Sequence, residues 1–155
     1  MSEKWVVNAS PLIVLCKVNH QWLLSELTDS VVVPRAVVEE IAAGPVNDPA
    51  RRFLLIEHGL TVVETPDPSP ELLAWDLGAG ETAVISYVLD NPGWVAVLDD
   101  LAARKCARSF SLSTMGTLGI VVKAKELGII TSAASVLRQL QSSGFRIKDD
   151  LAVVL

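Results

Sequence analysis

Cysteines, aromatic residues and long apolar runs are all scarce in this chain of 155 residues. The two cysteines, Cys16 and Cys106, lie far apart, which excludes a disulfide framework and a C-x-x-C zinc site. Aromatic residues make up 5% of the chain and aliphatic residues far outnumber them, as expected where helices cover a buried sheet on both faces. No apolar stretch approaches the ~18 residues of a membrane span, and the first residues lack a signal-peptide pattern. We therefore expect a cytoplasmic protein that does not enter a membrane and keeps its thiols reduced.

Half of the residues are apolar and a fifth are charged, which is typical of a folded protein and excludes a disordered one. The length predicts a single domain over residues 1–155. Short valine-rich segments alternate with longer helical patterns, which predicts a three-layer α/β/α fold with a parallel, roughly five-stranded central sheet. The expected strands are 5–7, 31–33, 60–63, 95–98 and a weaker one at 110–112, and the expected helices are 12–18, 21–27, 35–43, 50–58, 71–77, 81–89, 101–108, 117–127 and 132–143.

Charge is distributed unevenly along the chain. The net charge is −5, yet residues 1–98 carry −8 whereas residues 101–148 carry +7. The remaining −4 comes from Asp99, Asp100, Asp149 and Asp150. This asymmetry indicates either a polyanionic partner or ordinary solvated helix faces, and charge alone leaves both alternatives open. The basic residues of the second part are Arg104, Lys105, Arg108, Lys123, Lys125, Arg138, Arg146 and Lys148.

Polar side chains follow the predicted strands, at the positions where α/β folds bind ligands. Asn8 follows the first strand, Glu40 lies beyond the second, Glu81 opens a helix, and Asp99 and Asp100 follow the fourth strand. Together they predict a carboxylate cage for Mg²⁺ or Mn²⁺, because hard cations prefer oxygen ligands and keep neighbouring carboxylates ionised. Taken singly, Glu81, Asp99 and Asp100 are also explained as helix caps, and Glu40 as a solvated side chain.

A resemblance to a known family is carried by five segments in order: NASPLI (8–13), VPRAVVEEI (33–41), LGAGETAVI (77–85), LDDLAAR (98–104) and GTLGI (116–120). Together they resemble the PIN-domain nucleases, specifically a prokaryotic PIN-like branch of unknown function. The resemblance implies a parallel five-stranded sheet and an acidic site that binds Mg²⁺ or Mn²⁺ and hydrolyses phosphodiester bonds, usually in RNA. For many members it also implies a toxin of the VapBC type, a small antitoxin partner and a homodimer.

Carried over by position, the resemblance gives catalytic and metal-binding roles to Glu40, Glu81 and one of Asp99 and Asp100, a pair that the spacing does not separate. Asn8 stands where the family's first acid is expected to be aspartate. Its amide oxygen can ligate a cation but contributes no charge, which implies weaker metal binding. The resemblance also implies nucleic-acid contacts from the hydroxyls of Ser10 and Thr117 and from the basic side chains of Arg104, Lys105, Arg108, Lys123 and Lys125.

The sequence therefore predicts a metal-dependent ribonuclease that acts on RNA, or alternatively on DNA, and serves as the toxin of a toxin–antitoxin pair. The alternative is a catalytically weak or inactive PIN-like module that binds an antitoxin or nucleic acid. Asn8 in place of the family's aspartate is the feature that favours it. Other α/β classes lack their motifs. A phosphoacceptor receiver and a haloacid-dehalogenase-like phosphatase need acids directly after the first strand, and a dinucleotide-binding fold needs G-x-G-x-x-G there.

Overall fold

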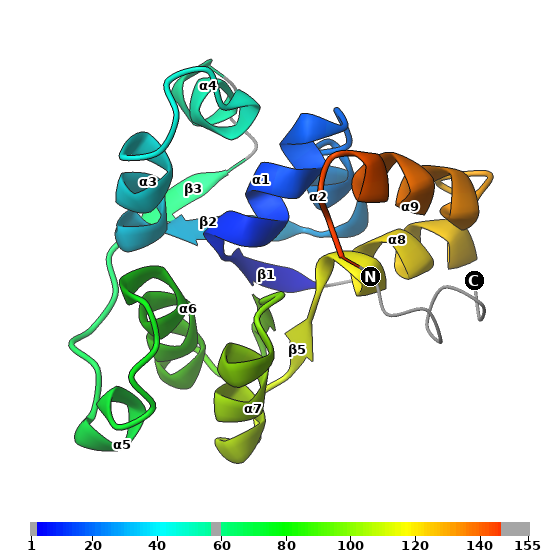
Figure 1. The fold of residues 1–155 in the computed structure, drawn as a ribbon. Helices are drawn as coiled ribbons and strands as arrows, with labels where there is room; N and C mark the ends of the chain where they lie inside the picture. Colours follow the sequence, from blue (N-terminus) through cyan, green and yellow to red (C-terminus); the bar gives the residue numbers. More distant parts are fainter. Residues whose placement is uncertain (1–2, 57–59, 147–155) are drawn as a thin grey trace.

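The structure is a computed structural model that describes residues 3–56 and 60–146 (Figure 1). Its strands are β1 (Lys4–Val7), β2 (Ser30–Pro34), β3 (Thr61–Val63), β4 (Val95–Val97) and β5 (Thr114–Met115). Its helices are α1 (Ala9–Lys17), α2 (Leu23–Leu27), α3 (Arg35–Ala42), α4 (Pro49–Ile56), α5 (Pro70–Leu73), α6 (Ala79–Asp90), α7 (Leu101–Ser109), α8 (Thr117–Glu126) and α9 (Ala133–Ser142).

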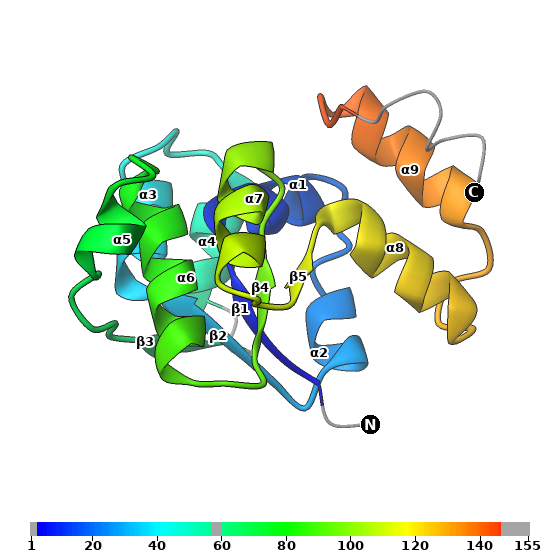
Figure 2. The same cartoon turned by 90° about the horizontal axis from the view of Figure 1, so that it is seen from below.

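The five strands form one parallel sheet in the order β3-β2-β1-β4-β5. The register places Val6 of β1 between Val32 of β2 and Ala96 of β4. Helices α1 and α2 lie on one side of the sheet and α6 and α7 on the other (Figure 1), while α8 and α9 pack side by side at one end (Figure 2). The predicted three-layer α/β/α fold is confirmed. The strand order reverses between β1 and β4, which is where open α/β sheets bind their ligands.

The core is built around β1, the central strand of the sheet. Parallel strands covered on both faces consist of near-continuous apolar runs, and Trp5, Val6 and Val7 are fully buried. Both cysteines are buried and free, which confirms the expectation that neither forms a disulfide. In the part of the chain that the structure describes, the helices are too short or too polar to cross a bilayer.

The first helix begins earlier than its sequence pattern predicted. It starts at Ala9, so Pro11 lies within the first turn, where the missing N–H of proline costs no helical hydrogen bond. The consequence for the site is that Asn8 becomes the N-cap residue, directly between β1 and α1. The helix predicted to run to His58 is described up to Ile56, and residues 57–59 and 147–155 lie outside the described residues.

The fifth strand was predicted in the wrong place. It lies at Thr114–Met115 and not at residues 110–112. Phe110 is the C-cap of α7, and Ser111 adopts a φ of 60°, so the chain is still turning where the strand was expected. The helix predicted over 71–77 is likewise only Pro70–Leu73, because Asp76 has a φ of 52°. Apolar residues in these turns gave the same sequence pattern as a strand or a helix, which is why both predictions were wrong.

Candidate functional site

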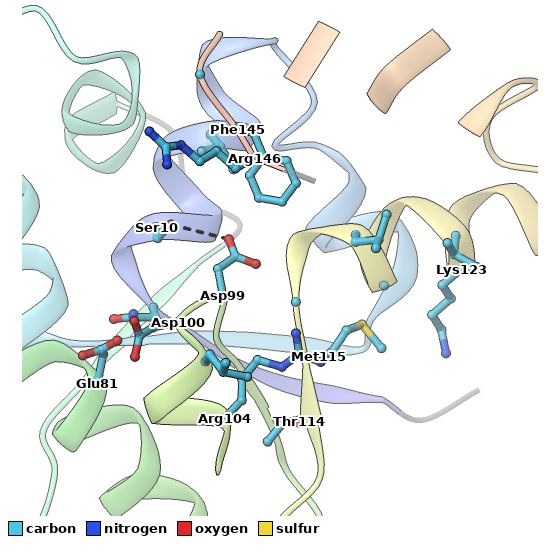
Figure 3. A pocket seen from close by; sticks show the side chains of 18 of the residues that line it. Ser10, Glu81, Asp99, Asp100, Arg104, Thr114, Met115, Lys123, Phe145 and Arg146 are labelled. Carbon is cyan, nitrogen blue, oxygen red and sulfur yellow. Dashed lines mark hydrogen bonds between the residues drawn. The ribbon is translucent and has the colours of Figure 1, made fainter. Parts of the chain in front are cut away.

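A cavity of about 1100 Å³ lies at the carboxyl ends of β1, β4 and β5 (Figure 3). Because parallel strands end at the same edge of a sheet, this edge gathers residues that are far apart in the sequence. The cavity is lined by seven of the predicted site residues, which are Asn8, Ser10, Glu81, Asp99, Asp100, Arg104 and Lys123. The edge where ligands were expected is therefore also where the cavity is found.

Asn8 presents a buried oxygen that nothing described in the protein satisfies. The residue is 5% exposed, and its backbone N–H donates to the Val97 carbonyl at 3.1 Å. Although Asn8 is the N-cap of α1, its side chain makes no capping hydrogen bond. Its Oδ1 has no hydrogen-bond partner among the described residues. Leaving a buried acceptor unpaired costs ~1–3 kcal/mol, so this oxygen is available to a ligand.

Gly80 brings Asn8 and Glu40 to the same small space. A β carbon at Gly80 would lie 2.8 Å from Glu40 Oε1 and 3.1 Å from Asn8 Oδ1. Both oxygens therefore face the backbone at the start of α6, and any side chain larger than glycine would fill the space between them. Glu40 is otherwise exposed and does not line the cavity itself.

Glu81 and Asp100 lie side by side at the cavity wall (Figure 3). Each also caps a helix: Glu81 Oε1 accepts the Gly78 N–H at 3.3 Å, and Asp100 Oδ2 accepts the Ala103 N–H at 3.0 Å. Burial raises the pKa of Glu81, the Gly78 N–H opposes that rise, and the carboxylates of Asp100 and Glu40 add to it. The helix-cap explanation of these two acids is therefore confirmed. It does not conflict with the predicted metal-binding role, since a cation at this edge would relieve their mutual repulsion.

Asp99 is held in a different way. Its Oδ1 accepts the Thr117 N–H at 2.7 Å, its Oδ2 accepts the Thr117 hydroxyl at 2.7 Å, and the Ser10 hydroxyl lies 3.5 Å from Oδ2. Asp99 thus caps α8 from outside that helix. Asp100 has the freer carboxylate of the pair, with an Oδ1 that makes no described hydrogen bond. Thr117 is fully buried, so its side chain positions Asp99 and offers no surface to a nucleic acid.

The close carboxylate cage expected from the sequence is not formed in the described part of the chain. Residues 3–56 and 60–146 contain no group of three or more His, Cys, Asp or Glu side chains placed to hold a metal ion together. The donor set instead fits a more open site. Mg²⁺ keeps several waters and is usually held by one or two carboxylates together with substrate phosphates. The unpaired oxygen of Asn8 would add a neutral ligand to Glu81 and Asp100, which line the cavity together with Asp99 and Glu126.

Basic side chains reach the cavity from three elements. Arg104 comes from α7, Lys123 from α8, and Arg146 from the segment after α9. The Nε of Arg104 is buried and has no hydrogen-bond partner among the described residues, whereas Lys123 forms an ion pair with Glu3. Three other predicted contacts to nucleic acid are exposed and do not line the cavity, namely Lys105, Arg108 and Lys125. Lys148 lies outside the described residues.

Phe145 and Arg146 line the cavity but were not among the predicted site residues. Phe145 is the last residue of a Schellman motif that ends α9, and Arg146 follows it. In this motif the Phe145 N–H donates to the Leu140 carbonyl at 3.0 Å and the Gly144 N–H to the Gln141 carbonyl at 3.1 Å. Gly144 has a φ of 106°, which glycine adopts without strain. The glycine after a helical pattern indicated a helix end. The direction in which the chain then leaves depends on how α9 packs.

Comparisons with known proteins agree with this fold. A family model described as DUF3368, a PIN domain, matches residues 4–154. The crystal structure of PAE2754 from Pyrobaculum aerophilum is similar in fold, with a TM-score of 0.53 and 16% sequence identity over 79% of this chain and 90% of that one. No curated protein matches the chain. PIN domains are generally nucleases and generally use divalent metal ions. Because the family model spans nearly the whole sequence, this chain belongs to the PIN domain family DUF3368.

Proposed function

We propose that this protein is a metal-dependent ribonuclease that hydrolyses phosphodiester bonds in the cavity at the sheet edge. One observation carries the proposal: the buried Asn8 Oδ1 has no described partner and shares the space beside Gly80 with Glu40 Oε1. An unsatisfied buried oxygen next to carboxylates is costly unless a cation occupies the site. Glu81 and Asp100 complete an oxygen-rich edge of the kind that suits Mg²⁺ or Mn²⁺.

The chain's own residues divide the work between holding the ion and receiving the phosphate. Asn8, Glu40, Glu81 and Asp100 would hold Mg²⁺ or Mn²⁺, which when bound polarises a phosphoryl oxygen and acidifies a water for in-line attack. Both carboxylate oxygens of Asp99 accept hydrogen bonds from Thr117, so Asp99 fixes the junction between β4 and α8. Arg104 lines the same cavity with an unpaired Nε, and its guanidinium would neutralise charge on the phosphate.

A binding-only module is the second candidate, and two observations favour it. Asn8 is neutral where the resemblance predicts an aspartate, and the carboxylates are not gathered into a close cage in the described ranges. Both features lower the affinity for a cation. A carboxylate that is missing or distant attracts the cation less, and this attraction is what offsets the cost of dehydrating the cation. Such a module would bind nucleic acid or an antitoxin through the same cavity without cutting.

The finer parts of the proposal rest on the resemblance to PIN-domain nucleases alone. They are RNA as the substrate (with DNA as the alternative), a toxin role with a small antitoxin as the partner, and a homodimer in the cytoplasm. Induced expression of the chain in a bacterial host should arrest growth, and the Glu81→Gln variant at equal expression should not. Equal growth with both would contradict the toxin role while leaving the nuclease activity to be judged in vitro.

The decisive experiment is a calorimetric titration with Mn²⁺, run beside incubation with mixed RNA and DNA pools with and without EDTA. Glu81→Gln removes a carboxylate from the cavity wall. Glu71→Gln makes the same change in the first turn of α5, outside the cavity, and is the matched control. Metal binding and EDTA-sensitive cleavage that are lost only in Glu81→Gln would support the nuclease. Metal binding without cleavage of either pool would favour the binding-only module, and no metal binding would leave the acids as helix caps.

A further inference from the structure

We propose that the apolar end of the cavity is a nucleobase subsite, in which Phe145 stacks on the base adjacent to the cleaved phosphate. This subsite rests on the proposed function and deepens it, because it requires the substrate to be single-stranded at the cleaved phosphate. Its position follows from the lining of the cavity, which contains a set of apolar side chains beside the acids of the proposed metal site.

The apolar end is formed by side chains that keep part of their surface free. Val14, Met115, Leu118, Val122 and Phe145 line the cavity, and each is only partly buried. A volume of about 1100 Å³ is more than a cation and one phosphate occupy, and it is comparable with pockets that enclose whole small molecules. An apolar wall beside a phosphate-binding edge suits a planar base attached to that phosphate through a ribose.

Phe145 is placed at this wall by a rigid local structure. The two hydrogen bonds of the Schellman motif fix the backbone on both sides of Gly144, and Phe145 packs partly against the hydrophobic core. Figure 3 shows its side chain directed into the cavity that Asp99 also lines. A ring that is already held in place loses little entropy when a base stacks on it, which is why rigid aromatic side chains are effective binding groups.

One basic side chain of the cavity lining suits a nucleic-acid backbone. Lys123, Arg146 and the acid Glu126 all line the cavity, and Lys123 is paired with Glu3. Arg146 is exposed and makes no ion pair with any residue in the described ranges. Its guanidinium is therefore available to a phosphate that flanks the stacked base. The faces of a base inside a duplex are covered by its neighbours, so stacking on Phe145 requires a single strand.

Fluorescence anisotropy with a short labelled RNA of mixed sequence tests the subsite without relying on cleavage. Binding is measured for the single-stranded RNA and for its duplex. Each measurement is made in EDTA and again in Ca²⁺, that is, without and with a divalent cation. Phe145→Leu keeps an apolar side chain for packing but removes the ring, and Phe145→Trp restores a stacking surface. Trp75→Leu removes a partly exposed aromatic residue outside the cavity and is the matched control. Thermal unfolding of each variant identifies any general loss of structure.

We expect Phe145→Leu to weaken single-stranded binding by about five- to 150-fold, the range of one base–aromatic stack. Binding by Phe145→Trp and Trp75→Leu should stay near that of the wild type, and duplex binding should be weak in all. Unchanged single-strand affinity in Phe145→Leu, equal losses for strand and duplex, or no RNA binding in either buffer would overturn the subsite. Failure of the nuclease proposal has a different signature: RNA binding that depends on Phe145, without metal-dependent cleavage.

Discussion

Replacing Asn8 with aspartate tests whether this residue occupies a metal-ligand position. The change keeps the size of the side chain and adds one negative charge at a position that is 5% exposed. The new carboxylate would face Glu40 Oε1 across Gly80, on the edge that Glu81 and Asp100 already make acidic. Without a cation the substitution should destabilise the fold, and with a cation it should strengthen binding.

The cost of the substitution can be worked from the geometry. The distances of 2.8 and 3.1 Å from the β-carbon position of Gly80 place the two oxygens within about 6 Å of each other. Two unit charges at that separation repel by about 3 kcal/mol at an effective dielectric constant of about 20. This repulsion would raise the pKa of the new carboxyl above the ordinary value of an aspartate. The penalty is therefore complete above that raised pKa and vanishes below the ordinary pKa of an aspartate, about 4.

Urea unfolding in EDTA at pH 7 and below pH 4, together with Mn²⁺ titration, measures both effects. Asn8→Asp should lose about 3 kcal/mol of unfolding free energy at pH 7 and recover it at the lower pH, whereas its Mn²⁺ affinity should rise at least about tenfold. Asn47→Asp adds the same charge in an exposed turn between α3 and α4 and should change neither quantity. If Asn8→Asp alters stability but leaves Mn²⁺ affinity unchanged, Asn8 is not a ligand and its placement in the metal site is refuted.

Four further predictions concern the same edge. Because burial and like charges raise the pKa of Glu81, its ionisation costs stability above that pKa, so Glu81→Gln should unfold in EDTA at neutral pH no more easily than the wild type. Protonation competes with the metal, so calorimetry should also show wild-type Mn²⁺ affinity falling as the pH drops through that pKa. Thr117→Val removes the 2.7 Å hydrogen bond to Asp99 and should cost ~1.5–3 kcal/mol in urea unfolding; an unchanged midpoint would show that this contact contributes nothing. Gly80→Ala should preserve helicity by circular dichroism and weaken Mn²⁺ binding, because its methyl would lie 2.8 Å from Glu40 Oε1; undiminished binding would place the ion elsewhere.

Much of the candidate site could be named from the sequence because its residues follow predicted strands or, for Glu81, open a predicted helix. Asn8, Glu81, Asp99 and Asp100 all lie at the carboxyl edge of the sheet and line one cavity. Their separate roles could not be read in the same way. Spacing left Asp99 and Asp100 equivalent, and only the position of Thr117 shows that the first is engaged through both carboxylate oxygens whereas the second keeps one free.

The sequence by itself determined the layer architecture, because valine-rich strands alternate with helices and parallel strands must then be joined by crossovers. It also determined where α9 ends, since Gly144 alone meets the backbone demand of the Schellman motif at no steric cost. The tertiary structure decided which side chains meet. The unpaired oxygen of Asn8, the shared space beside Gly80 and the entry of Phe145 into the cavity are contacts between elements distant in the chain. Such contacts depend on how helices pack across the sheet, and no local pattern of residues encodes them.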